Sequence, residues 1–168
     1  RQNLTLADGT DLSLNTNTRV SVRFSDRQRT LTLEQGEIAL DVGNKSRVPL
    51  TVVVGDVSIR DIGTQFNVSR LNGVVRVTVR EGIVDMASGG ARAQRLTAGQ
   101  EGAFSEAQRV HSVKRIDPEP AFAWQSSRAI YQATPLSDVV RDLNRYYEKP
   151  IVIGGTAGLG FSAVKAFI

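Results

Sequence analysis

The sequence predicts a mainly β fold: a many-stranded sandwich or solenoid-like β domain, followed by a small α/β piece of βαβ order. Apolar and polar residues alternate through much of residues 3–86, which is the period of strands with one buried face. Turn signals recur about every ten residues in this region, as in all-β domains. A helical apolar period occurs only after residue 120.

The strand pattern begins in residues 3–42. Leucines alternate around an Asp8-Gly9 turn, and the runs RVSVRFS and TLTLEQGEIALDVG continue the alternation. These runs follow no fixed repeat length, so a regular β-helix is not established. A sandwich, a barrel and a stacked solenoid all remain open at this point.

The strongest pattern lies in residues 48–86, where valine and isoleucine alternate with polar residues between turn signals. Asn72-Gly73 favours a type I′ hairpin turn, because both residues tolerate a positive φ. No proline interrupts the runs, so we expect these strands inside a sheet. Residues 87–94 indicate a loop, and residues 95–104 indicate a last strand pair around Gly99.

The alternation is lost after residue 105, and the next segment contains Pro118 and Pro120. We therefore expect an all-β domain over residues 1–105, a linker over residues 106–120 and an α/β subdomain over residues 121–168.

In the subdomain, apolar residues at helical spacing predict one helix over about residues 135–148, with Thr134 as its N-cap. Arg141 and Arg145 are expected on its exposed face. The apolar Ile151–Ile153 is expected to form a short buried strand.

The charge pattern argues against nucleic acid as a partner. The 21 basic and 17 acidic residues give a net charge of +4, and both signs are interspersed along the chain rather than gathered in a basic stripe. The arginines from Arg23 to Arg29 are expected on a solvated face. Cysteine is absent, which removes disulfides and thiolate metal sites but fixes no compartment. No apolar run has the length of a membrane helix, and the first residues are no signal peptide.

The residues also show no pattern typical of a multiple-turnover enzyme, a metal site or a cofactor site. His111 is the only histidine and is expected to be a solvent-exposed linker residue, which excludes histidine metal clusters and a Ser-His-Asp triad. The carboxylates form no paired acid/base set. The segment GGTAGLG lacks the lysine and hydroxyl residue of a phosphate loop, so we interpret it as a flexible connection.

One dipeptide has two interpretations. Gly63-Thr64 interrupts a strong strand pattern, so it can mark a bulge or a sharp bend. Alternatively it is a strained peptide bond, and the Thr64 hydroxyl attacks the carbonyl of Gly63, since hydroxyl nucleophiles form esters when a proton acceptor assists. From the residues alone, the structural interpretation is favoured.

Several segments resemble the FecR family, the periplasmic parts of membrane-spanning anti-sigma factors. The resemblance lies in Gly36-Glu37, in the block GTQFNV that begins at Gly63, and in Glu81-Gly82, which occur in the family's order and spacing. The residues after Trp124 resemble the first part of a secretin/TonB short N-terminal (STN-like) domain, which is expected to be truncated here.

The resemblance implies a signalling function. Such proteins hold a sigma factor with a cytoplasmic domain, cross the inner membrane of Gram-negative bacteria once, and sense a TonB-dependent outer-membrane transducer that responds to ligands such as iron-siderophore complexes. This chain would be the periplasmic part, and it would reach the sigma factor and the membrane only through segments that the sequence lacks. Some members cut themselves at a Gly-Thr bond, here Gly63-Thr64, in a single turnover.

The transducer's signalling domain is expected to bind residues 124–168, because an exposed strand edge accepts another strand. The expected partner-binding residues are Trp124, Tyr131, Arg141, Arg145, Tyr146, Val164 and Phe167. Trp124 also suits a core position, because it is a large apolar anchor. The alternative function is a carbohydrate- or surface-binding β-sandwich, which would need an exposed aromatic platform, although aromatics make up only 6% of the chain.

Overall fold

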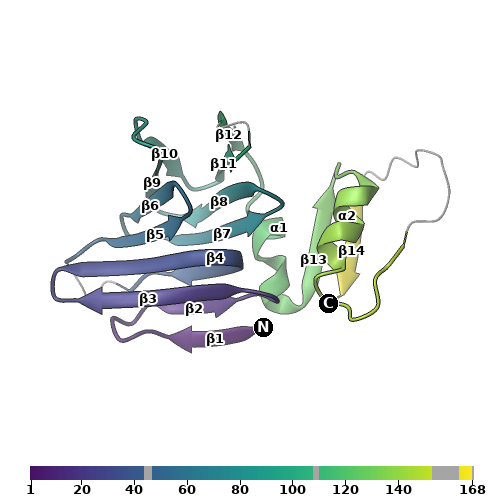
Figure 1. Cartoon of the computed structure of the whole chain (residues 1–168), viewed down its shortest axis with the longest axis horizontal. Coiled ribbons are helices and arrows are strands. Elements are labelled where there is room, and N and C mark those ends of the chain that lie inside the picture. Colours follow the sequence, from purple (N-terminus) through teal and green to yellow (C-terminus); the bar gives the residue numbers. More distant parts are fainter. Residues whose placement is uncertain (44–46, 108–109, 153–162, 168) are drawn as a thin grey trace. The chain divides into compact units, whose positions relative to one another are not determined.

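The computed structural model of the chain describes residues 1–43, 47–107, 110–152 and 163–167. The chain divides into two compact units, Arg1–Pro118 and Glu119–Ile168, whose elements are labelled in Figure 1. The predicted mainly β fold is confirmed. In the described residues, a 12-stranded sheet forms the first unit, and the second contains a two-stranded sheet with short helices.

The strands of the first unit follow one another through short connections. Their bounds are β1 Gln2–Thr5, β2 Asp11–Leu14, β3 Arg19–Ser25, β4 Gln28–Asp41, β5 Leu50–Val54, β6 Val57–Asp61, β7 Gln65–Leu71, β8 Val74–Glu81, β9 Ile83–Ser88, β10 Gln94–Thr97, β11 Gln100–Ser105 and β12 Val110–Arg115. The predicted hairpin turn joins β7 to β8: φ is 53° at Asn72 and 71° at Gly73, and a type I′ turn requires positive values at both positions.

The longest strand, β4, divides the sheet into two halves at Gly36. Its first part pairs with β3 and, in parallel, with β5, whereas its second part pairs with β2 and β7. Gly36 has φ +93°, and an added Cβ would lie 2.6 Å from the Cα of Thr18, so only glycine fits this bend. From β4 the sheet continues through β5, β6, β9 and β10 on one side and through β7, β8, β11 and β12 on the other.

The two halves of the sheet enclose one apolar core. Leu31 and Ile59 from one half and Phe66 and Val77 from the other are completely buried in the same cluster. The end strand β10 approaches β11, the strand next to the other end of the sheet, and a Cβ added to Gly102 would lie 2.8 Å from Leu96. The first unit is therefore a sandwich-like sheet that nearly closes into a barrel.

This unit extends further than the sequence predicts. Val110–Arg115 forms β12, which pairs antiparallel with β11, so part of the expected linker belongs to the sheet. His111 therefore lies in a strand and not in a linker. Its ring nitrogen Nε2 hydrogen-bonds the Ser88 hydroxyl, and its ring lies 4.7 Å from that of Phe104. An available edge on β11, rather than a strong apolar alternation, accounts for this strand.

The second unit contains short elements. Their bounds are α1 Glu119–Phe122, a 3₁₀ turn Ala123–Ser126, β13 Arg128–Gln132, α2 Leu136–Leu143 and β14 Ala163–Phe167. β13 and β14 pair antiparallel. In the described residues, no helix combines the length and the apolar character that spanning a membrane requires.

Three details of the predicted subdomain are wrong. The helix is shorter than 135–148, and its N-cap is Pro135, because the hydroxyl of Thr134 donates to the carbonyl of Gln132 instead of capping the helix. Ile151 and Val152 are not in a strand, and Val152 is 80% exposed, since β13 takes its partner from β14 instead. Ile153 and the segment GGTAGLG lie outside the described residues.

Candidate functional site

The Gly63-Thr64 peptide bond lies at a sharp bend between β6 and β7. Gly63 has φ +85°, a conformation that glycine adopts freely and that strains any residue with a Cβ. The chain crosses here from one half of the sheet to the other, because β6 pairs with β9 whereas β7 pairs with β4 and β8. The backbone N–H of Val42 donates to the carbonyl of Thr64 over 3.0 Å, which holds Thr64 against the end of β4.

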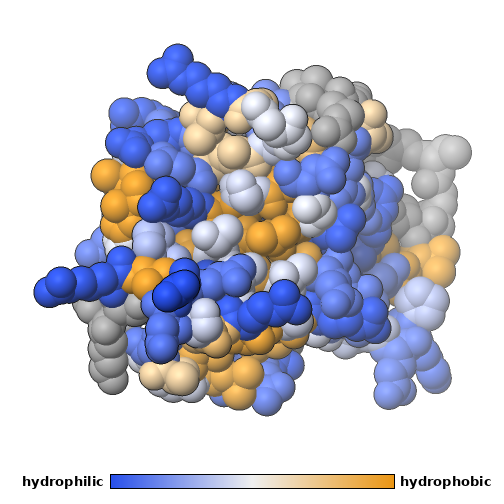
Figure 2. Space-filling model, turned by 60° about the vertical axis from the view of Figure 1, so that its left-hand side comes forward, coloured by the Kyte–Doolittle hydropathy of each residue, from blue (hydrophilic) through white to orange (hydrophobic). Residues whose placement is uncertain are grey.

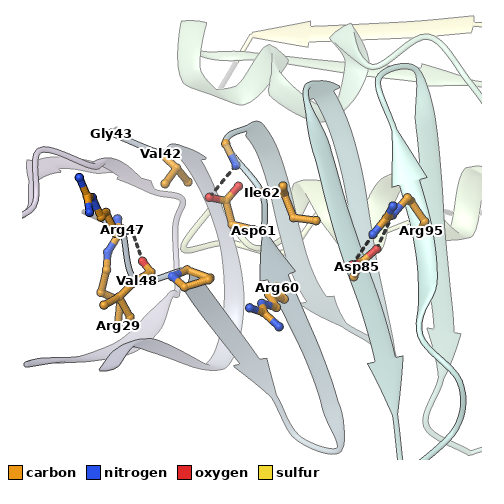
Figure 3. A pocket seen from close by; sticks show the side chains of 12 residues that line it. Arg29, Val42, Gly43, Arg47, Val48, Arg60, Asp61, Ile62, Asp85 and Arg95 are labelled. Atoms are coloured by element: carbon orange, nitrogen blue, oxygen red, sulfur yellow. Dashed lines mark hydrogen bonds and ion pairs between the residues drawn. The ribbon is translucent and has the colours of Figure 1, made fainter. Parts of the chain in front are cut away.

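Asp61, the last residue of β6, turns back onto this bond. Its Oδ1 accepts a hydrogen bond from the Thr64 hydroxyl. Its Oδ2 accepts one from the backbone N–H of Gly63 over 3.1 Å, drawn as a dashed line in Figure 3. Asp61 and Thr64 are each only 5% exposed. A single buried carboxylate therefore positions both the hydroxyl and the residue whose carbonyl that hydroxyl would attack.

The surroundings adjust the acidity of this carboxyl. Burial raises the pKa of Asp61 to about 6, while the backbone N–H groups of Gly63 and Ile62 and the charge of Arg29 act in the opposite direction. The carboxyl is therefore largely ionised at neutral pH. A proton acceptor whose pKa lies near the working pH is efficient in proton transfer.

The bond is packed against Gly82, between β8 and β9. A Cβ added to Gly82 would lie 2.2 Å from the carbonyl oxygen of Gly63 and 2.5 Å from Cγ2 of Thr64, and Gly82 has φ +82°. Only glycine allows the backbone of the β8–β9 junction to approach so closely. This contact is a physical reason for the Glu81-Gly82 pair in the sequence.

Gly63 gives solvent access to the bond, because it is exposed whereas Thr64 is buried. It lines two hollows, of about 530 Å³ and about 140 Å³. The smaller hollow is bordered by Asp41 and Glu81. Around the larger hollow, Figure 3 shows the arginines Arg29, Arg47, Arg60 and Arg95. Water can therefore reach the acyl side of the bond.

Arg29 is buried, and the expectation of a solvated face is wrong for this residue. Its guanidinium Nε donates to Asp8 over 2.7 Å, and Nη1 donates to the carbonyl of Val48 over 2.9 Å. Burial would raise the pKa of Asp8, but the backbone N–H of Thr10 and the Arg29 guanidinium outweigh burial and lower it. The pair holds the turn after β1 against β4.

A second polar cluster explains two further sequence features. Glu37, beside Gly36, accepts hydrogen bonds from the side-chain amides of Asn15 over 2.7 Å and Asn67 over 3.0 Å. Asn67 belongs to the GTQFNV block. This carboxylate joins β4 and β7 to the turn after β2, so its role is structural.

The residues expected to bind a partner differ in exposure and contacts within the second unit. Trp124 is only 5% exposed, which suits its core interpretation. The Tyr131 hydroxyl donates to Asp142 over 2.6 Å. Val164 and Phe167 lie in β14, and nothing is described of their side chains.

The two arginines of the predicted helix face differ. Arg141 has a 56% exposed side chain and pairs with Asp138 over 3.0 Å. Arg145 lies beyond the end of α2 and is 14% exposed; it pairs with Asp142 over 2.8 Å and lies 5.7 Å from the ring of Tyr146. The prediction that Arg145 lies on an exposed helix face is therefore wrong, because the helix ends at Leu143.

Sequence reasoning misses Asp61, because a carboxylate at the end of a strand pattern resembles any other turn residue. The signal that could have found it is the spacing Asp-x-Gly-Thr. A glycine at positive φ between the acid and the hydroxyl residue bends the chain back, so the two side chains can meet.

Comparisons with known proteins show what this chain resembles. The family model described as FecR protein matches residues 1–85. Two crystal structures of candidate anti-sigma factors from Parabacteroides distasonis have the same fold. One has a TM-score of 0.84 at 24% identity and covers 99% of this chain and 80% of that chain. The other has a TM-score of 0.78 at 25% identity and covers 88% of this chain and 70% of that chain. No curated protein matches the sequence.

Proposed function

The chain belongs to the FecR family, and on this premise we propose that it is a regulatory module, the signal-sensing part of an anti-sigma factor. The family match over residues 1–85 carries the proposal, and the likeness to two candidate anti-sigma factor structures supports it. The test is a reporter gene under the cognate sigma factor, in cells that carry the natural protein with or without residues 1–168. Deletion should make the reporter unresponsive to the inducing signal, and an unchanged response would contradict the proposal.

The place and partners in this proposal follow from the family resemblance. The chain lies in the periplasm as part of a single-pass inner-membrane protein of a Gram-negative bacterium. A cytoplasmic domain beyond this sequence holds the sigma factor. The signal arrives from the signalling domain of a TonB-dependent transducer that has bound a ligand such as an iron-siderophore complex. A fused reporter enzyme that is active only in the periplasm tests the location.

The transducer's docking surface is assigned to the second unit, which the family resemblance describes as STN-like. In the described residues, β13 and β14 pair only with each other, so each strand has a further edge. Edge strands accept a strand from a partner through main-chain hydrogen bonds. Arg141, with its exposed side chain, would attract an acidic partner, and this attraction would weaken as salt is added.

Binding of the purified signalling domain tests this assignment. A chain that ends at Pro118 should keep a cooperative unfolding transition and lose binding. In the full chain, Arg141→Glu should weaken binding, whereas Arg92→Glu, an exposed change in the first unit, should not. Unchanged affinity after removal of residues 119–168 would place the docking surface on the β domain.

A further part of the proposal is that Gly63-Thr64 cleaves itself. The contact of the Thr64 hydroxyl with a buried carboxylate supports this, because activation of a hydroxyl needs an adjacent proton acceptor. Thr64→Ala should abolish cleavage and Thr64→Ser should retain some, as mass spectrometry of the fragments would show. Cleavage of Thr64→Ala at the same bond would identify a separate protease as the agent.

The carbohydrate- or surface-binding alternative is not favoured by any observation. In the part of the chain that the structure describes, the exposed large hydrophobic residues are Leu4, Val22, Ile62, Val113, Tyr147, Ile151 and Val152. Tyr147 is the one aromatic residue among them, so these residues form no aromatic platform. On the face shown in Figure 2, hydrophilic side chains lie between the apolar areas.

A further inference from the structure

We propose that Asp61 is the catalytic base of the Gly63-Thr64 cleavage: its carboxylate takes the proton of the Thr64 hydroxyl and delivers it to the departing nitrogen. This inference rests on the self-cleavage proposed above. It adds the group that makes an otherwise unreactive hydroxyl a nucleophile.

The contact geometry supports this role. A nucleophile and its base are recognised by a direct hydrogen bond between them, and the Thr64 hydroxyl donates to Oδ1 of Asp61. The second oxygen of the same carboxylate holds the N–H of Gly63 over 3.1 Å. The base is thus fixed against both residues of the bond.

Neighbouring carboxylates are less well placed. Asp41 borders the smaller hollow beside the bond, but its Oδ2 accepts a hydrogen bond from the side chain of Gln65 over 2.7 Å. Asp41 is also exposed, whereas Asp61 is 5% exposed. A buried ionised carboxylate is a stronger proton acceptor than an exposed one, because burial disfavours its charged form.

The reaction balances with water as the single co-reactant. The Thr64 Oγ attacks the carbonyl carbon of Gly63 while its proton moves to Asp61. The bond between the Gly63 carbon and the Thr64 nitrogen then breaks, and the nitrogen takes the proton from Asp61. The product is an ester between Gly63 and the Thr64 oxygen. Water then hydrolyses this ester, which leaves a carboxylate on Gly63 and a free amine and hydroxyl on Thr64.

Several charged groups lie around the Gly63-Thr64 bond, and among them the charge of Arg29 acts on the pKa of Asp61. On the side of the larger hollow they are Arg29 from β4, Arg47 from the loop before β5, Arg60 from β6, Asp85 from β9 and Arg95 from β10. On the other side they are Asp41 from β4 and Glu81 from β8. The charge of Arg29 lowers the pKa of Asp61, although burial dominates.

The experiment measures fragment formation in the full chain, made by cell-free translation so that cleavage starts from an intact polypeptide. Asp61→Asn keeps the side-chain shape but cannot take the proton, so cleavage at pH 7.5 should slow by about 100-fold or more. Asp41→Asn, the matched control, should cleave at the wild-type rate. Circular dichroism and thermal unfolding check that both variants fold.

Two further measurements test the role of Asp61, and the first uses the wild-type chain alone, so it stays decisive if Asp61→Asn folds poorly. The wild-type rate should rise with pH and level off above the pKa of Asp61, about 6, because only the ionised carboxylate accepts the proton. Hydroxylamine cuts an ester that has already formed, so it should speed cleavage of the wild type and fail to rescue Asp61→Asn.

The outcomes separate the two proposals. Wild-type-like cleavage by Asp61→Asn, rescue of that variant by hydroxylamine, or a wild-type rate that is flat between pH 5 and 8 would each overturn the role of Asp61 while self-cleavage stands. An intact wild-type chain under all these conditions would refute self-cleavage itself, and the role of Asp61 with it.

Discussion

At the scale of single residues, the buried carboxyl of Asp61 makes the free energy of unfolding depend on pH. Its pKa is raised from 3.8 to about 6 in the folded chain, so the folded state binds this proton more tightly than the unfolded state does. The associated stability is complete below pH 3.8 and is lost as the pH rises through about 6.

Asp61→Asn should remove this dependence. Both chains would carry Thr64→Ala, so that the bond stays intact. Between pH 3.5 and pH 7.5, the chain that keeps Asp61 should lose on the order of 3 kcal/mol of unfolding free energy relative to the Asp61→Asn chain, because one pKa unit corresponds to about 1.4 kcal/mol. Urea unfolding at the two pH values measures this difference. Parallel pH curves for the two chains would contradict it.

The Asp8–Arg29 ion pair has the opposite effect on stability, because the pKa of Asp8 is lowered. Arg29→Ala leaves the Asp8 carboxylate buried without its guanidinium, and removal of one partner from a buried pair costs about 3–5 kcal/mol. Because the pKa of Asp8 is lowered, its contribution is present above pH 3.8 and disappears as the pH falls below that value. Denaturant unfolding at neutral pH measures the loss. The exposed Arg27→Ala is the control and should change stability by less than about 0.5 kcal/mol; an equal effect of both changes would contradict the assignment.

These residues also show where sequence analysis reaches its limit. The sequence places Gly63 and Thr64 at a break in a strand pattern, and the structure shows a bend there. The burial of Arg29 could not be predicted, because its partner Asp8 lies 21 residues away and only the pairing of β4 brings them together. The role of Asp61 depends in the same way on the positive φ at Gly63, which the amino-acid sequence alone does not reveal.

At the scale of elements, the β8–β9 junction must approach the Gly63-Thr64 bond closely, and Gly82 makes this approach feasible. Gly82→Ala should therefore destabilise the fold more than Gly73→Ala does. Both positions have a positive φ, of 82° and 71°, and this alone costs about 1–3 kcal/mol for a non-glycine residue. A Cβ at Gly73 meets nothing within 4 Å, whereas a Cβ at Gly82 would lie 2.2 Å from a backbone oxygen.

Thermal unfolding of the two variants in a Thr64→Ala background provides the comparison. Equal losses would show that the junction relaxes around the new methyl group and that the close approach is unimportant.

The elements were predictable to the extent that local pattern determines them. Alternation and turn residues predict strands such as β6, β7 and β8 and the hairpin at Asn72-Gly73. Weakly patterned β12 forms because β11 offers an edge, an interaction outside the local sequence pattern. The helix α2 begins within one residue of its predicted start but ends at Leu143, although the apolar period continues to Tyr147.

At the scale of the whole molecule, the position of the bond determines what cleavage can do. The segment before Gly63 contributes β1 to β6, and the segment after it contributes β7 onward. The ladders β4–β7 and β6–β9 join the two segments, and Leu31, Phe66 and other buried side chains of both segments share one core. Cutting the bond therefore removes a covalent link without separating the layers.

We expect the fragments 1–63 and 64–168 to remain associated as one folded complex. They should elute together from a size-exclusion column in native buffer and separate only in denaturant. The melting temperature of the cleaved protein should rise with protein concentration, because its unfolding also dissociates two chains. That of the uncut Thr64→Ala chain should not, because its unfolding is unimolecular. Separation of the fragments in native buffer would show that the ladders across the cut are too weak to hold the module together, and cleavage alone would then dismantle it.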